Sequence, residues 1–247
     1  MFSLYLMKLS VIVPAYNEEK LIVSSLASIQ RALAPAVQLG CQTELIVVDN
    51  GSSDRTAELA TRSGASVVFE PVRQIARARN AGAATATGDW LLFIDADCWP
   101  EPALISNVLD CIQDGRVMGG GSTVKMEGMS FPLVLLSRLW NGVSRLLGWA
   151  AGSFIFCRAN AFHEIDGFSL TYYVAEEIDL TIRLKRWARD HDSRFVILHR
   201  HPLLTSGRKE WLYTRSEIAG TFWKMLRHPR RFFRDRSLCT PWYDGRR

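Results

Sequence analysis

The chain has 247 residues, of which 48% are hydrophobic, and a formal net charge of +5. This composition excludes a disordered chain, and the length fits one large domain or one domain with a small appendage. The five cysteines form no CxxC pair, so neither a disulfide framework nor a zinc site is indicated, and we expect free thiols in a cytoplasmic protein. The apolar start at 1–6 is too short for a signal peptide, and Met7 is an alternative start to Met1.

Short β-branched runs alternate with helical patterns through the first half of the chain. Strands are expected at 9–13, 44–48, 66–69 and 90–94, and helices at 18–33, 54–62 and 75–87. Ser52 or Ser53 would cap the second helix, and Gly88 would end the third. This alternation predicts an α/β fold with a mostly parallel, Rossmann-like sheet covered by helices on both faces.

The second half is less regular. Strands are expected at 117–126, after a turn at Gly119-Gly120-Gly121, and at 153–156 and 194–198, with helices at 135–147, 176–189 and 211–227. The 135–147 helix is amphipathic, with leucines on one face and polar residues such as Asn141 and Ser144 on the other. We expect its apolar face to pack on the core; the alternative is a helix that lies in a membrane interface.

Polar residues follow three of the expected strands directly. They are Tyr16-Asn17-Glu18, Asp49-Asn50-Gly51 and Asp95-Ala96-Asp97. Ligands of open α/β sheets bind beyond the carboxyl ends of the strands. The sequence therefore predicts a ligand site where these three strand ends meet.

Asp95 and Asp97 flank one alanine after a buried strand. Two carboxylates so close repel each other, and a bound cation relieves that cost. Oxygen ligands suit Mg²⁺ and Mn²⁺, which commonly bridge to phosphates. The alternative is a solvated turn in which the carboxylates cap backbone groups.

Acidic residues open the expected helix at 176–189. Glu176, Glu177 and Asp179 stand in its first turn, where the helix dipole alone favours them. A carboxylate directed into a crevice could instead act as a general base.

Basic residues offer further candidates. Arg73, Arg77 and Arg79 could bind a diphosphate or form a solvated helix face. His199 or His201 could be a third metal ligand, although a surface histidine is the default for each.

The C-terminal region interleaves aromatic and basic residues. They are Trp223, Phe232, Phe233 and Trp242, with Lys224, Arg227, Arg230, Arg231 and Arg234. This mixture favours peripheral contact with an anionic membrane over nucleic-acid binding; the alternative is a packed terminal helix with a solvated basic face.

Four segments together resemble family 2 glycosyltransferases of the GT-A fold. They are 9–19, 44–56, 77–82 and 88–97, in the order and spacing of that family. Looser matches follow at 152–158, 165–168, 176–180 and 205–209.

The resemblance implies roles for matched residues. Asp97 would bind a metal, Mn²⁺ or Mg²⁺, and Asp95 the metal or the ribose, while Glu177 would be the catalytic base of an inverting reaction. The residues implied to bind the nucleotide-sugar are Pro14, Ala15, Tyr16, Glu18, Asp49, Asn50, Arg77, Asp95 and Ala96. Two residues depart from the family pattern, since Asn50 and Glu177 each stand where an Asp is common.

We therefore expect a GT-A domain at 1–205, with a donor-binding half at 7–115 and an acceptor half at 116–205, and a basic, aromatic helical extension at 206–247. The expected reaction moves a sugar from a UDP-, GDP- or dTDP-sugar to a hydroxyl of a glycan or lipid-linked acceptor. The expected location is the cytoplasm or the inner face of the cell membrane. The alternatives are a nucleotidyltransferase that makes nucleotide-sugars and a non-catalytic nucleotide-binding or membrane-adaptor module.

Overall fold

The computed structural model describes residues 7–244 and residue 246. The interpretation of residues 1–6 as an apolar start therefore lies outside the described residues. Only the backbone is described for Phe131, Pro132, Lys209, Glu210, Arg215, Phe222, Pro229 and Arg230. The expected contribution of the Arg230 side chain to a basic surface is likewise outside them.

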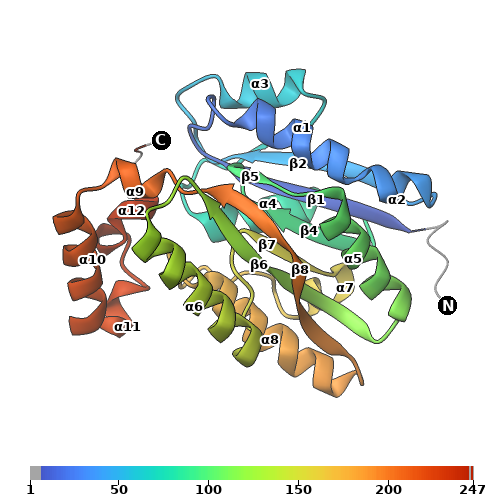
Figure 1. Ribbon diagram of the computed structural model, residues 1–247. Coiled ribbons are helices and arrows are strands. Elements are labelled where there is room, and N and C mark those ends of the chain that lie inside the picture. Colours follow the sequence, from blue (N-terminus) through green and yellow to red (C-terminus); the bar gives the residue numbers. More distant parts are fainter. Residues whose placement is uncertain (1–6, 245, 247) are drawn as a thin grey trace.

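A single eight-stranded sheet forms the centre of the molecule (Figure 1). Its first half is parallel, with β1 (Lys8–Ala15) between β2 (Gln42–Asp49) and β4 (Trp90–Ile94), and β3 (Ser66–Phe69) outside β2. These strands agree closely with the predicted ones, because each is a short β-branched run bounded by polar or turn residues.

The second half of the sheet contains both parallel and antiparallel strand pairs. The remaining strands are β5 (Cys98–Trp99), β6 (Val117–Glu127), β7 (Phe154–Arg158) and β8 (Arg194–Ser206). β7 runs antiparallel to both β4 and β6, while β8 runs parallel to β6. The short β5 pairs with the end of β8, which brings the segment after Asp97 beside Thr205 and the residues that follow it.

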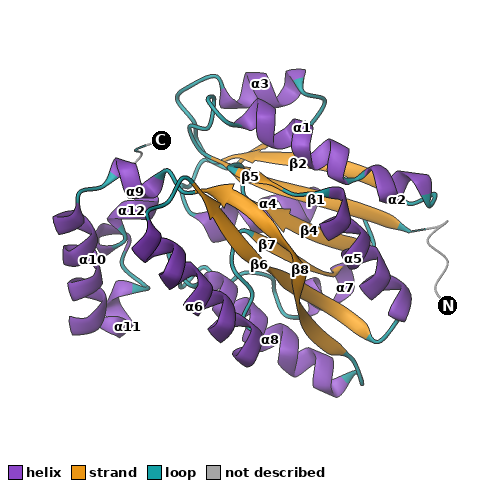
Figure 2. Cartoon of the chain, viewed as in Figure 1, coloured by secondary structure: helices purple, strands orange, loops and turns teal. Residues whose placement is uncertain are grey.

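Helices cover both faces of the sheet (Figure 2). One face carries α1 (Ile22–Ala32), α2 (Ala34–Gln38), α3 (Thr56–Arg62) and α5 (Pro102–Asp114). The other face carries α4 (Ile75–Thr85), α7 (Ala159–Glu164) and α8 (Glu176–Asp190). Because side chains alternate along a strand, Val11 and Val13 join the first core and Ile12 joins the second. The predicted α/β fold with two covered faces is thus confirmed.

The glycines that were predicted to form a turn or to end a helix have a different structural role. Gly119, Gly120 and Gly121 lie within β6 and form no turn before it. A Cβ at Gly120 would stand 2.8 Å from the ring of Phe156. Gly88 lies beyond the end of α4 and does not cap it; a Cβ there would stand 2.8 Å from the carbonyl oxygen of Lys8. These glycines are required because neighbouring strands approach each other closely there. None of them is needed for a left-handed turn.

Two helix boundaries also differ from the prediction. Neither Ser52 nor Ser53 caps α3; instead the Asp54 carboxylate accepts a hydrogen bond from the Thr56 N–H at 2.9 Å. The helix expected at 211–227 is divided into α9 (Lys209–Leu212) and α10 (Arg215–Arg227). Thr214 forms a capping box with Glu217, and this local signal begins a new helix.

The amphipathic helix α6 (Phe131–Leu147) is packed in the opposite sense to the one expected. Its polar residues face the sheet: Asn141 accepts from the Val124 N–H at 3.0 Å and donates to the Val124 carbonyl at 2.7 Å, and Ser144 is buried. Its leucines from Leu135 onward are exposed, Leu146 to 85%. The expectation that the apolar face packs on the core is therefore wrong, because the sheet edge under α6 offers backbone polar groups that only the polar face can pair.

The C-terminal helices fold back onto the sheet domain. After α10 come α11 (Pro229–Phe232), the 3-10 turn η2 (Arg236–Leu238) and α12 (Thr240–Tyr243). A small core of Phe232, Cys239 and Tyr243 packs against Ile75 and Tyr173 of the main domain. Within the described residues, no helix has both the length and the hydropathy to span a membrane.

Candidate active site

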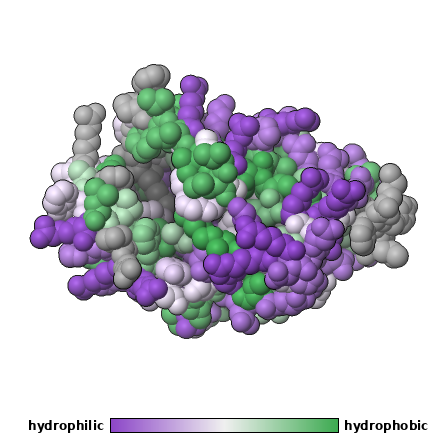
Figure 3. All heavy atoms as spheres, turned by 90° about the horizontal axis from the view of Figure 1, so that it is seen from below, coloured by the Kyte–Doolittle hydropathy of each residue, from purple (hydrophilic) through white to green (hydrophobic). Residues whose placement is uncertain are grey.

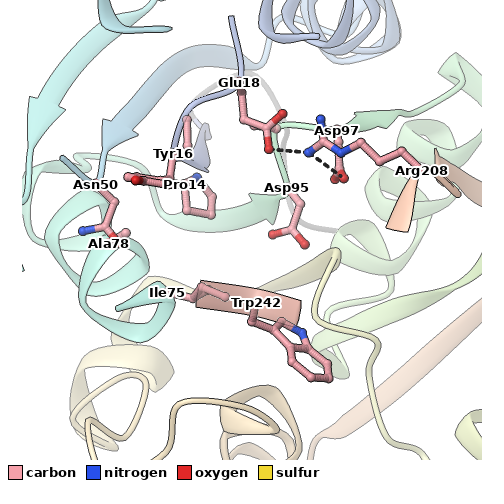
Figure 4. A pocket seen from close by; sticks show the side chains of 12 residues that line it. Pro14, Tyr16, Glu18, Asn50, Ile75, Ala78, Asp95, Asp97, Arg208 and Trp242 are labelled. Carbon is pink, nitrogen blue, oxygen red and sulfur yellow. Dashed lines mark hydrogen bonds and ion pairs between the residues drawn. The ribbon is translucent and has the colours of Figure 1, made fainter. Parts of the chain in front are cut away.

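The three predicted strand ends meet at one cavity of about 100 Å³ (Figure 4). Its lining contains most of the residues implied by the family resemblance. They are Pro14, Ala15, Tyr16, Glu18, Asn50, Asp95, Ala96 and Asp97, joined by Ile75, Ala78, Arg208 and Trp242.

Two of the implied nucleotide-binding residues lie outside that lining. Asp49 is buried, and its carboxylate accepts from the Ser52 N–H at 2.9 Å, which holds the turn at Gly51 (φ 79°). Arg77 is half-buried on α4 and does not line the cavity. Its neighbour Arg79 takes the inner position, because residues two apart in a helix point to different sides.

Asn50 lines the cavity but its amide is already used by the loop that leads to α4. The amide donates to the carbonyl oxygens of Glu70 at 3.0 Å and Val72 at 2.8 Å, and accepts from the Gln74 N–H at 3.0 Å. A carboxylate could not donate these two hydrogen bonds. The departure from Asp at this position thus has a structural cause in the loop.

Arg79, one of the three arginines predicted as candidates for diphosphate binding, is the organising cation of the site, but its pairing with Asp95 and Glu176 was not predicted. Its guanidinium, only 2% exposed, donates to Asp95 at 2.9 Å, to Glu176 at 2.8 Å and to the Gly152 carbonyl at 2.9 Å. Burial lowers the pKa of Arg79, but the facing carboxylates outweigh that effect and raise it, so the guanidinium stays charged. Helical spacing could have placed Arg79 toward the sheet, because it lies on the same inner face of α4 as Gly82 and Ala83.

Arg208, from the turn after β8, bridges two carboxylates of the cavity (Figure 4). It contacts Glu18 closely and lies 3.4 Å from the Asp97 carboxylate. The pairing of β5 with β8 holds it there, since Cys98 pairs with Thr205. The sequence interpretation noted the segment 205–209 only as a loose match and assigned Arg208 no role.

The two glutamates at the start of α8 have different surroundings. Glu176 is 4% exposed and is bound to Arg79, whereas Glu177 lines an open groove together with Asp95 and Asp97. Burial, with Glu177 beside it, raises the pKa of Glu176 above its ordinary range, against the lowering effect of Arg79. Burial also raises the pKa of Glu177, against the lowering effect of Arg79. Glu177 is thus the glutamate that a substrate in the groove would meet.

The groove beside Glu177 is large and mostly apolar, with a volume of about 530 Å³. One end holds the carboxylates of Asp95, Asp97 and Glu177. The rest lies between α6 and the C-terminal helices and is lined by apolar residues that include Met129, Leu133, Ile218, Met225, Phe232, Phe233 and Trp242.

The expected histidine ligands lie away from this site. His199 and His201 lie within β8, which is longer than predicted, and neither lines the cavity or the groove at Asp97. Among the described residues, no group of three or more His, Cys, Asp or Glu side chains could hold a metal ion. The oxygen atoms of Asp97 and Asp95 nevertheless fit a hard divalent ion that is held by one or two carboxylates and completed by substrate phosphates.

The comparisons with known proteins agree with the family that the sequence resembles. Residues 10–171 match the family described as Glycosyl transferase family 2, and the chain belongs to that family. The mannosyltransferase PcManGT from Pyrobaculum calidifontis, solved in complex with GDP-Man and Mn²⁺, has a TM-score of 0.63 at 21% identity over 92% of this chain and 62% of its own. This likeness confirms the GT-A fold.

Two relatives match part of the chain in sequence. A dolichol-phosphate mannosyltransferase of Pyrococcus furiosus is 31% identical over 144 residues, which are 53% of this chain and 39% of the relative. An undecaprenyl-phosphate 4-deoxy-4-formamido-L-arabinose transferase of Pectobacterium carotovorum is 37% identical over 114 residues, 43% of this chain and 34% of the relative. The chain therefore spans less than two fifths of the length of these relatives.

Proposed function

We propose that this protein transfers a sugar from a nucleoside diphosphate donor to a lipid-linked acceptor. The groove of about 530 Å³ carries the proposal, because it joins an apolar lining to the carboxylates of Asp95, Asp97 and Glu177. A long apolar chain suits such a lining, and the reacting group at its end would meet the carboxylates. Two relatives are named for dolichol phosphate and undecaprenyl phosphate, which supports the same class of acceptor.

In this proposal the nucleoside occupies the cavity lined by Pro14, Tyr16 and Asn50, and the diphosphate lies next to Asp97. Asp97, with Asp95 beside it, would hold Mn²⁺ or Mg²⁺. When bound, the ion would neutralise the negative charge that develops on the diphosphate leaving group. Arg208, at 3.4 Å from Asp97, would add positive charge at the same place.

Glu177 is the proposed general base. It would take the proton from an acceptor hydroxyl, and the oxygen would attack the anomeric carbon on the face opposite the diphosphate. The bond from that carbon to the diphosphate oxygen breaks as the new bond forms, so the configuration inverts. The open position of Glu177 in the groove supports this role, while Glu176 is engaged by Arg79.

The names of the two relatives support a second nucleophile, a phosphate group in place of a hydroxyl. A phosphate oxygen of a polyprenyl phosphate could attack in place of a hydroxyl. A phosphate monoester is largely ionised at neutral pH and needs no general base. Replacement of Glu177 by Gln should therefore abolish transfer to hydroxyl acceptors and spare transfer to polyprenyl phosphate.

The experiment is a donor and acceptor panel. UDP-, GDP- and dTDP-sugars are incubated with the protein, Mn²⁺ or Mg²⁺, and either a polyprenyl phosphate or a glycolipid. Equal amounts of nucleoside diphosphate and of glycosylated lipid are expected for one donor. In a parallel sample with added pyrophosphate, conversion of the nucleotide-sugar into nucleoside triphosphate and sugar 1-phosphate would show a nucleotidyltransferase. Donor binding without any reaction would show a non-catalytic module. Either result contradicts the proposal.

We also propose a position on the cytoplasmic face of the membrane. The five cysteines are free, which suits a reducing compartment, and a lipid-linked acceptor would require contact with the bilayer.

A further inference from the structure

α6 presents a continuous apolar face away from the protein. Its exposed leucines are Leu135 (59%), Leu136 (58%), Leu139 (64%), Leu146 (85%) and Leu147 (41%). The opposite, polar face is fixed to the sheet by the two hydrogen bonds between Asn141 and Val124. The exposure therefore belongs to the native packing, and an uncovered apolar face of this kind indicates a binding surface.

Further exposed apolar side chains adjoin this face. The indole N–H of Trp211 donates to the Gly128 carbonyl at 3.0 Å, which ties α9 to the segment just before α6. Trp211 is 75% exposed, and on α10 Trp223 is 63% and Leu226 is 60% exposed. Hydrophobic atoms gather on the left and centre of the face in Figure 3, the side on which α6 and the C-terminal helices lie in Figure 1.

Positive charge borders the apolar face of α6. Arg138 and Arg145 are exposed at its edge and, with Lys125 and His199, line a cavity of about 470 Å³ between α6 and the strands below it. Among the described residues, no acidic side chain lines this cavity, and the sequence of α6 contains none. Leucines and tryptophans beside arginines are the composition of helices that lie in the interface of an anionic bilayer.

A second copy of the chain suits this surface poorly. A symmetric dimer through α6 would bring the same arginines of both copies together, and α6 supplies no carboxylate to pair with them. An anionic lipid surface has the complementary charge.

We propose that the outer face of α6, together with Trp211 and the exposed apolar residues of α10, inserts into the interface of an anionic membrane. The apolar groove lies between α6 and α10, so this contact would place its mouth at the lipid from which an acceptor chain could enter. The use of the groove by a lipid acceptor rests on the proposed function, whereas the membrane contact does not.

Vesicle cosedimentation of the full chain tests the membrane contact. Binding is expected to phosphatidylcholine vesicles that contain phosphatidylglycerol, and to weaken with salt and on vesicles of phosphatidylcholine alone. The double variant Leu139→Asp/Leu146→Asp should lose binding by about tenfold or more, because charged groups would replace inserted side chains. Arg138→Gln/Arg145→Gln should lose the preference for anionic lipid.

A matched control is Val23→Asp/Val37→Asp, which places the same charges on exposed aliphatic positions of α1 and α2, 48% and 59% exposed. It should bind vesicles like the wild type. Failure of the wild type to bind anionic vesicles would overturn the proposal, as would unchanged binding by the leucine variant. Light scattering that shows a dimer which the leucine variant dissociates would assign the surface to a second copy and also overturn it.

The same samples separate this proposal from the proposed function. Sugar transfer to a short-chain, water-soluble acceptor should be equal in the wild type and the leucine variant. If vesicles bind but no acceptor is glycosylated, the proposed function fails and the membrane contact stands. If transfer occurs but vesicles do not bind, the membrane contact fails.

Discussion

Single residues of the site are held by charge more than by apolar packing. Asp95 and Glu176 share the guanidinium of Arg79, and Glu18 and Asp97 share that of Arg208. Each arginine is buried or nearly so and neutralises carboxylates that would otherwise repel each other. These ion pairs hold the carboxylates of the site in place.

Arg208 should compete with a divalent ion for Asp97. In Arg208→Gln, the carboxylates of Glu18 and Asp97 lose a shared positive charge, so the metal-free protein should be less stable and Mn²⁺ should bind more tightly. Titration followed by the electron paramagnetic resonance of free Mn²⁺, without nucleotide, measures the affinity. Arg183→Gln, which removes an ion pair with Asp179 on α8, serves as a control that should leave Mn²⁺ binding unchanged. Equal Mn²⁺ affinity of Arg208→Gln and the wild type would contradict this role.

Transfer to a hydroxyl acceptor should depend on the protonation of Glu177. Burial raises the pKa of Glu177 above the ordinary 4.5, and only the deprotonated form can accept a proton. The rate should therefore fall as the pH drops through that raised pKa and level off above it. Glu177→Gln should lower kcat by about 10²- to 10⁴-fold and remove this acidic limb. A pH–rate profile of the wild type and the variant checks this assignment. If the variant kept the same fall in rate at acidic pH, the titrating group would not be Glu177.

At the scale of elements, the close contact of helix α4 with the sheet fixes the position of the site residues that α4 supplies. α4 supplies Ala78 and Arg79, and it approaches the sheet at Gly82, where a Cβ would contact Ile12 and stand 2.9 Å from Val48. The Cβ of a larger residue would push the helix, and with it Arg79, away from the strands.

Gly82→Ala should therefore reduce stability by about 1–3 kcal/mol, the usual cost of overpacking, and weaken donor binding as well. The matched control is Gly142→Ala on α6, where nothing beyond the adjacent residues and backbone of the helix itself lies within 4 Å of the added Cβ. It should be neutral or stabilise by up to about 1 kcal/mol, because alanine favours a helix. Urea unfolding of both variants measures the difference, and equal midpoints would argue against the tight contact of α4.

The sequence predicts elements well where the signal is local. The strands at 66–69 and 90–94 were predicted to the residue, because each is a short apolar run between turn residues. The position of α6 could not be predicted, since periodicity identifies an apolar face but not the side on which the sheet lies. Arg208 could not be found either, because it reaches Asp97 through the pairing of β5 with β8, across a long separation in the chain.

At the scale of the whole molecule, the C-terminal helices supply residues to the site at the strand ends of the sheet. Trp242 lines both the cavity and the groove, and Tyr243 links the two halves of the domain. The Tyr243 hydroxyl accepts from the Ile75 N–H at 3.3 Å and donates to the Tyr173 carbonyl at 2.9 Å. The expected extension at 206–247 is thus packed against the main domain, and its first residue, Ser206, still belongs to β8.

Tyr243→Phe tests this link. It keeps the ring but removes the hydroxyl, so two backbone groups lose a partner, and we expect a loss of about 1–3 kcal/mol of stability. Donor affinity should fall too, since Ile75 and Trp242 line the cavity. Tyr172→Phe, in the loop that carries Tyr173, is a suitable control, because the structure describes no hydrogen bond of its hydroxyl. Thermal unfolding with and without nucleotide distinguishes the two variants; equal effects would contradict the linking role.

The central claim is that Asp97 and its neighbours bind a nucleotide-sugar with a metal ion and support transfer to a lipid-linked acceptor. The most direct measurement is the metal-dependent formation of glycosylated lipid, counted together with the nucleoside diphosphate released, for the wild type and for Asp97→Ala. We predict equal amounts of both products from the wild type, loss of both on chelation of the metal, and a drop of about 10²-fold or more in the variant. Transfer by Asp97→Ala at the wild-type rate, with the same metal dependence, would contradict the account.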